Sequence, residues 1–80
     1  MMVEVDFKRT PSTNWMSILK NQVNKYYFDD IDKFIQWVEN EWQCKVDTEE
    51  RDGIKYIVAL TFTEENYLYA ILKFGTPNKT

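Results

Sequence analysis

The residues best suited to chemistry in this 80-residue chain are one cysteine and two pairs of adjacent carboxylates. A cysteine attacks as its thiolate, and the chain contains no histidine that could take the proton from Cys44. The pairs Asp29/Asp30 and Glu64/Glu65 each stand where a helix is expected to begin, and acidic residues stabilise a helix N-terminus without any catalytic role. The sequence therefore predicts a protein that is not an enzyme.

Metal and cofactor sites are equally poorly supported. The stretch "DTEERDG", residues 47–53, has the composition of a calcium loop. If Gly53 were the glycine of such a loop, the first ligand would be Thr48 and Ala59 would replace the closing glutamate. Gly75 is the only other glycine, which excludes glycine-rich phosphate-binding loops. We expect neither a metal nor a cofactor.

Charge is distributed unevenly along the chain. Residues 1–28 carry two acids and four bases, a balance of +2, and residues 53–80 carry two acids and three bases, a balance of +1. Residues 29–52 carry nine acids and three bases, a balance of −6. This acidic block argues against a nucleic-acid groove in the middle of the chain and favours a partner with a basic surface.

The N-terminal third must supply a strand and one ambiguous element. Apolar Val3, Val5 and Phe7 alternate with charged residues, which predicts a half-buried strand over residues 2–9. Residues 14–27 have helical apolar spacing, and Thr10 followed by Pro11 is typical of a helix start. The same "PSTN" segment could instead turn a hairpin. We favour the helix.

The segment "DDIDKFIQWVENEW", residues 29–42, is the clearest amphipathic helix. Asp29 or Asp30 is suited to cap its start. Trp42 falls on its apolar stripe and is expected in the core, whereas Trp37 lies off the stripe and is expected to be exposed. The stripe consists of Ile31, Phe34, Ile35, Val38 and Trp42.

A hairpin is predicted after this helix. Asp52-Gly53 supplies the positive-φ pair of a two-residue turn. The arm over residues 44–51 alternates weakly, while the arm over residues 54–62 is apolar on both faces. The second arm is therefore expected to be a central strand that is covered on both sides.

The closing segment is expected to be a helix. Thr63 is a suitable cap, Glu64 and Glu65 fit the first turn, and Gly75 followed by Pro77 marks the end. With this spacing, one side is expected to face the core, flanked by Tyr67 and Phe74. That side consists of Leu68, Ile71, Leu72 and Gly75.

Together these elements predict an α+β fold: a small antiparallel sheet of about three strands with two or three helices, in a single domain over residues 1–80 with a frayed tail at 76–80. No apolar run is long enough for a membrane span, and a signal peptide is not evident. A single cysteine fits a reducing compartment, so we expect a cytoplasmic protein without membrane contact.

The stretch "LTFTEENYLYAILKFG", residues 60–75, resembles the closing segment of small accessory proteins of tailed bacteriophages. In these, a strand ends, an acidic pair follows and a helix closes the chain. The resemblance implies a phage or mobile-element protein that binds and modulates or inhibits a larger host protein in a bacterial cytoplasm. It assigns no functional residue.

The best-supported function is a non-enzymatic protein-binding module. Three Trp, five Tyr and five Phe are more aromatic residues than so small a core needs, and exposed aromatics flanked by charge are typical of interfaces. We therefore predict a partner-binding patch on the residues 29–42 helix and the following turn. The patch consists of Trp37, Glu41, Glu49, Glu50 and Asp52.

Three alternatives remain open. The acidic block could mimic nucleic acid and occupy the basic groove of a DNA- or RNA-binding protein. The chain could be a homodimeric structural component that buries its spare aromatics by self-association. Direct single-strand binding, by stacking on tyrosines beside basic residues, is disfavoured by the overall acidity. That last surface would consist of Tyr26, Tyr27, Tyr67, Tyr69, Lys8, Arg9, Lys20 and Lys25.

Overall fold

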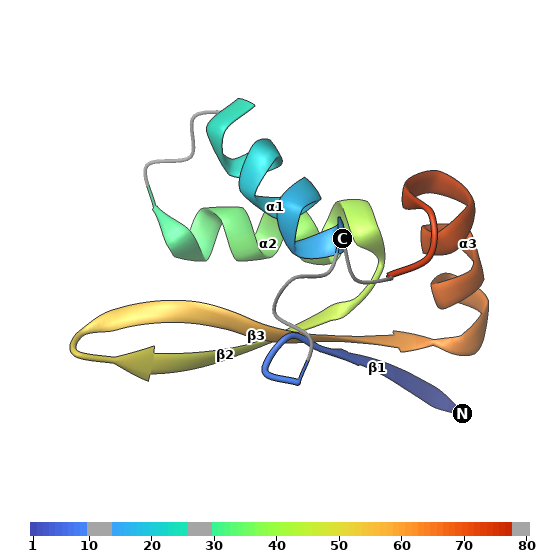
Figure 1. The fold of residues 1–80 in the computed structure, drawn as a ribbon, viewed down its shortest axis with the longest axis horizontal. Helices are drawn as coiled ribbons and strands as arrows, with labels where there is room; N and C mark the ends of the chain where they lie inside the picture. The colour runs from blue at the N-terminus through green and yellow to red at the C-terminus, as the bar shows by residue number, and fades with distance from the viewer. Residues whose placement is uncertain (10–13, 26–29, 78–80) are drawn as a thin grey trace.

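A computed structural model describes residues 1–9, 14–25 and 30–77 (Figure 1). The predicted α+β class is confirmed. The elements follow in the order β1 (Met2–Asp6), α1 (Asn14–Lys25), α2 (Ile31–Trp42), β2 (Lys45–Arg51), β3 (Ile54–Thr63) and α3 (Glu64–Phe74). The expectations for Thr10, Pro11, Tyr26, Tyr27, Asp29 and the last three residues lie outside the described residues.

The three strands form an antiparallel sheet in the order β1-β3-β2, so β3 is central as expected. Leu60 of β3 pairs with Val5 on one side and Val46 on the other, and all three are buried. Figure 1 shows the helices on one side of the sheet. The expectation that β3 is covered on both sides is therefore wrong. The residues after it continue as α3 beyond the end of the strand and do not return over the open face.

A bulge in β3 changes which side chains face the helices. Asp47 pairs with Ala59 but Thr48 pairs with Ile57, which leaves Val58 as an extra residue in β3. Such an insertion reverses the alternation of the residues beyond it. Ile57 therefore packs against the core, and Lys55 reaches Asp32 of α2 at 2.7 Å. The unbroken apolar face expected over residues 54–62 is wrong for this reason.

Helix α1 supplies the centre of the core, and the helical prediction for this segment is confirmed. Trp15 is fully buried, with its ring 5.3 Å from that of Trp42 and 5.7 Å from that of Phe62. Its indole N–H donates to the carbonyl oxygen of Gly75 at 2.8 Å. A buried indole usually finds such an acceptor, and this bond ties the start of α1 to the end of α3.

Helix α2 follows its predicted stripe except at Ile31, the first residue of the helix, which is 38 % exposed. Asp30 caps it by accepting a hydrogen bond from the backbone N–H of Asp32. Phe34, Val38 and Trp42 are buried in the core cluster. Trp42 is 2 % exposed, as expected for a core residue, and its ring stacks on Phe74 with 3.8 Å between centroids.

Helix α3 has the predicted ends but a different inner face. Thr63 caps it by accepting from the N–H of Asn66, and Gly75 has a positive φ of 81° just after it. The buried side carries Ala70, with Tyr67 and Phe74 packed against the core through Phe62 and Trp42. The two leucines point outward instead: Leu68 is 57 % and Leu72 is 83 % exposed. The aromatic contacts of Tyr67 and Phe74 thus fix the rotation of the helix.

Candidate partner-binding groove

The five residues of the predicted patch do not form one surface. Glu39, one turn before the end of α2, accepts from the N–H of Val46 at the start of β2. Glu41 therefore lies near the first residue of β2, whereas Asp52 follows its last. Seven strand residues at about 3.3 Å each separate the two by roughly 20 Å. Glu49, Glu50 and Asp52 do gather at the hairpin end.

Trp37 is also less exposed than expected. Its ring lies nearly parallel to that of Phe34, with centroids 6.0 Å apart and an interplanar angle of 15°. The side chain is half-buried and packs against the core cluster. It is therefore an edge of the core as much as a surface group, and the charged residues of the hairpin end lack an aromatic anchor from α2.

Several acids of the middle block have partners within the chain. Glu49 contacts Lys8 at 2.6 Å and Arg51 at 3.2 Å, and these hydrogen bonds, chiefly that from Lys8, hold its pKa below the usual value. Asp32 hydrogen-bonds to Lys55 and so raises the pKa of that lysine. Carboxylates that already have cationic partners are poorly placed to imitate phosphates, so the geometry gives nucleic-acid mimicry little support.

Cys44 is a free, half-buried cysteine just before β2. Burial, with smaller contributions from Glu39 and Asp47, raises the pKa of the thiol to about 12. The thiol is therefore protonated at neutral pH, and a protonated thiol is a poor nucleophile. Within the described residues, no group of three or more His, Cys, Asp or Glu side chains is placed to hold a metal ion.

The hairpin end of β3 extends beyond the residues that pair with β1. β1 pairs with β3 from Met2 to Asp6, and the N–H of Phe7 still donates to the carbonyl of Val58. Past this point, among the described residues, β3 pairs only with β2. Residues 54–57 thus have one edge that no strand of the described chain pairs with.

The turn determines which backbone groups point to this edge. Asp52 and Gly53 both have positive φ, 52° and 77°, as a tight two-residue turn requires. In such a hairpin the flanking residues, here Arg51 and Ile54, form a hydrogen-bonded pair, and the pattern alternates along the strand. The N–H and C=O groups of Lys55 and Ile57 therefore point away from β2.

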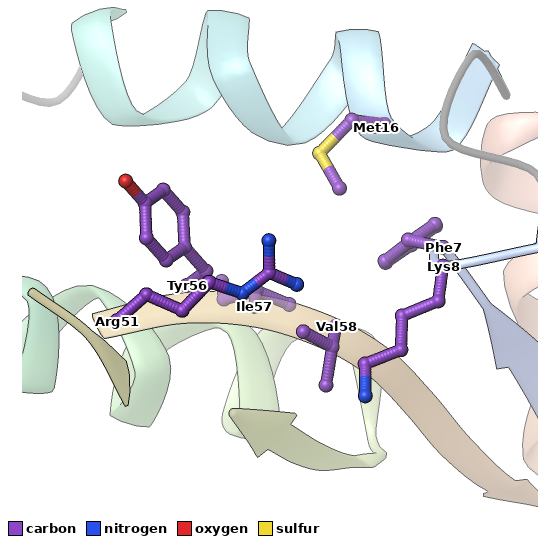
Figure 2. A pocket seen from close by; sticks show the side chains of 7 residues that line it. All are labelled: Phe7, Lys8, Met16, Arg51, Tyr56, Ile57 and Val58. Atoms are coloured by element: carbon purple, nitrogen blue, oxygen red, sulfur yellow. The ribbon is translucent and has the colours of Figure 1, made fainter. Parts of the chain in front are cut away.

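Two adjoining cavities lie between α1 and this part of β3, and we call them together the α1–hairpin groove. One, of about 460 Å³, is shown in Figure 2 and is lined by Phe7, Lys8, Met16, Arg51, Tyr56, Ile57 and Val58. The second, of about 430 Å³, shares Met16, Tyr56 and Ile57 and is otherwise lined by Leu19, Lys20, Val23, Ile31, Phe34 and Lys55. The groove is mainly apolar and begins where β1 ends.

Charge at the first cavity is unbalanced. Lys8 and Arg51 share a single carboxylate, that of Glu49. Arg51 uses its Nε for that contact, and its guanidinium lies 5.8 Å from the centroid of the Tyr56 ring. Figure 2 shows its terminal nitrogens directed toward the cavity. A guanidinium in this position can bind a second carboxylate through two N–H groups.

No helix in the described parts of the chain is long and apolar enough to cross a membrane. Comparison with known protein families, with curated proteins and with solved structures finds no match.

Sequence reasoning missed the groove, although one signal was present. The first predicted strand covers eight residues at most, whereas the arm after Asp52-Gly53 covers nine. A short strand cannot pair with the whole of a longer neighbour, so part of the longer strand had to be left without a partner on that side. Which end would be left could not be read from strand lengths.

Proposed function

We propose that this chain is a non-enzymatic protein-binding domain that takes an extended segment of its partner along the open edge of β3. The observation that carries the proposal is the early end of β1, which leaves residues 54–57 with outward backbone groups beside an apolar groove. Strand addition to such an edge gains main-chain hydrogen bonds, and adjoining pockets select the side chains.

The other edge of the hairpin is much less suited to this role. β2 has the sequence "KVDTEER", in which five of seven residues are charged. Charged side chains along an edge strand discourage pairing with another chain. The β3 segment "IKYI" has one charge in four, and its Ile54 and Tyr56 are 55 % and 46 % exposed.

The chemistry of the groove favours a particular kind of partner segment. Apolar side chains on it would contact Met16 and Ile57, and a carboxylate near its end would pair with Arg51. Such a segment has apolar residues at alternate positions followed by Asp or Glu. A partner of this kind would be recognised through the sequence of one short segment. A partner with a basic surface would instead bind at the acidic hairpin end.

The resemblance of residues 60–75 to phage proteins supports a bacterial host protein as the partner, modulated or inhibited by this binding. The strand end, the acidic pair and the helix that stops at Gly75 are all present in the structure. These features support the proposal at the level of local structure.

Two substitutions at one position test the edge. Lys55→Pro removes an outward N–H that the β2–β3 ladder does not use, while Lys55→Ala keeps that N–H. Both remove the ion pair with Asp32, so the alanine variant is the matched control. We would capture bacterial lysate proteins on each variant and on the unchanged chain, and compare thermal unfolding to verify the fold.

We expect a specific protein to be retained by the unchanged chain and by Lys55→Ala, and its affinity for Lys55→Pro to be at least tenfold lower. With that protein purified, hydrogen exchange at the amides of Lys55 and Ile57 should slow on binding. If a folded Lys55→Pro variant binds the protein as well as the control does, or if protection appears only at the acidic hairpin end, the proposed binding edge is wrong.

A further inference from the structure

The outer side of α3 carries a stripe of exposed apolar side chains that are not part of the core cluster of the described chain. Leu68 and Leu72 stand one helical turn apart and are 57 % and 83 % exposed, and Tyr69 beside them is 62 % exposed. Single exposed leucines are common, but three large side chains on one face of an eleven-residue helix form a patch. This face is separate from the α1–hairpin groove.

Charges at the two ends of the stripe are of opposite sign. Glu65, Tyr69 and Lys73 follow each other at intervals of four residues and so form one row along the edge of the stripe. Within the described chain Glu65 has no ion pair, and Lys73 makes only a contact of 5.5 Å between its Nζ and the ring of Phe74. The row is therefore acidic at one end, aromatic in the middle and basic at the other.

We propose that this stripe is the contact surface of a homodimer in which two copies of α3 pack antiparallel. A two-fold axis beside Tyr69 brings the same edge of both stripes together, because an isologous interface uses one patch twice. Glu65 of each copy then faces Lys73 of the other, since both stand four residues from Tyr69. Leu68 and Leu72 interdigitate with the same residues of the second copy.

The order of charges along the row favours a second copy of the chain, packed antiparallel, as the partner. In a parallel pair, each Glu65 would face another Glu65 and each Lys73 another Lys73. The antiparallel pair replaces both repulsions with attractions and buries the leucines at the same time. One helix face is small beside the roughly 800 Å² per partner of a standard interface. The dissociation constant of the dimer should therefore be micromolar or higher.

Charge reversal tests this arrangement in a way that folding defects cannot imitate. Glu65→Lys makes both charged ends of the row basic, and Lys73→Glu makes both acidic, so each variant repels a second copy of itself at both ends. Each single variant should associate about tenfold more weakly, given two exposed pairs per dimer. Mixing the two variants should restore association as a heterodimer, because the basic row of one then faces the acidic row of the other. Sedimentation equilibrium of the full chain, from micromolar to millimolar concentration, measures these species.

Leu72→Ser is the apolar counterpart and should weaken association by roughly a hundredfold, since two such side chains leave the interface. Circular dichroism should show each variant folded, because all three positions are exposed. The proposal is overturned if the unchanged chain stays monomeric at millimolar concentration. It is also overturned if a dimer forms that is unaffected by these variants, or if the mixture of single variants is no stronger than either alone.

Discussion

Helices α2 and α3 have similar lengths and similar capping, but they use their apolar residues in opposite ways. α2 buries Phe34, Val38 and Trp42, three of the five residues of its predicted stripe. α3 is fully buried only at Ala70, while Leu68 and Leu72 face outward. The apolar pattern of the sequence shows which side chains could be buried, and the position of the helix on the sheet decides which are.

The cause of this difference is the place of each helix in the fold. α2 lies against one face of the sheet beside α1, so that a wide stripe is enclosed (Figure 1). α3 follows β3 without a loop and packs at the end of the sheet, where Tyr67 contacts Phe62 of β3 and Phe74 stacks on Trp42 of α2. With two large rings, Tyr67 and Phe74, already filling that contact, the leucines are left on the outside.

The largest effect is expected from the core of α2. Trp42→Ala should lower the free energy of unfolding by about 3–5 kcal/mol, because it leaves a cavity beside Trp15 and Phe74. Urea denaturation followed by circular dichroism measures the change. Trp42→Phe preserves most of the volume and should lose less, which provides a measurable variant if the alanine variant does not fold. A change below about 1 kcal/mol for Trp42→Ala would contradict the packing of α2.

An intermediate effect is expected at Trp37 on the same helix. Because its ring is half-buried and lies against Phe34, Trp37→Ala should cost about 1–2 kcal/mol, less than Trp42→Ala. The same denaturation experiment applies. If the free energy of unfolding falls as much as for Trp42→Ala, Trp37 belongs to the core. If it does not fall at all, Trp37 is the exposed side chain that the sequence suggested.

Removing the N-terminal cap of either helix should lower the free energy of unfolding by about the same amount. Asp30→Ala and Thr63→Ala each remove an acceptor for one N–H of the first turn, worth about 1 kcal/mol. Asp30→Asn and Thr63→Ser retain an acceptor oxygen and serve as controls. Thermal unfolding of the four variants measures this. An alanine variant no less stable than its control would show that the cap does not form in solution.

The smallest effect on stability is expected from the outer side of α3. Leu72→Ala should change the free energy of unfolding of the monomer by less than about 0.5 kcal/mol, because the side chain is almost fully exposed. The measurement must be made at low micromolar concentration, so that self-association does not contribute. A loss near that of Trp42→Ala would mean that Leu72 faces the core and that the rotation of α3 is wrong.

Much of the fold could be predicted from local signals. Capping residues located the starts of α2 and α3, and Asp52-Gly53 located the hairpin turn. These signals act over a few residues, so they can be read directly from the chain. The bulge at Val58 could not, because nothing in "IKYIVALTF" distinguishes it from a regular strand.

The candidate site could be predicted less well, because it depends on contacts between distant elements. The sequence suggested that the end of α2 and the hairpin turn share a surface. Because α2 and β2 run antiparallel, however, Glu41 near the end of α2 lies far from the turn. The groove joins Phe7, Met16 and Tyr56 from three parts of the chain, and only the tertiary structure brings them together.

The central claim is that the hairpin end of β3 has an open edge, and NMR-detected hydrogen exchange on the free protein tests it most directly. The amides of Ile54 and Tyr56 point to β2 and should be protected, whereas those of Lys55 and Ile57 point to the groove and should exchange much faster. Equal protection at all four amides would mean that the edge is already occupied, and the binding proposal would then be contradicted.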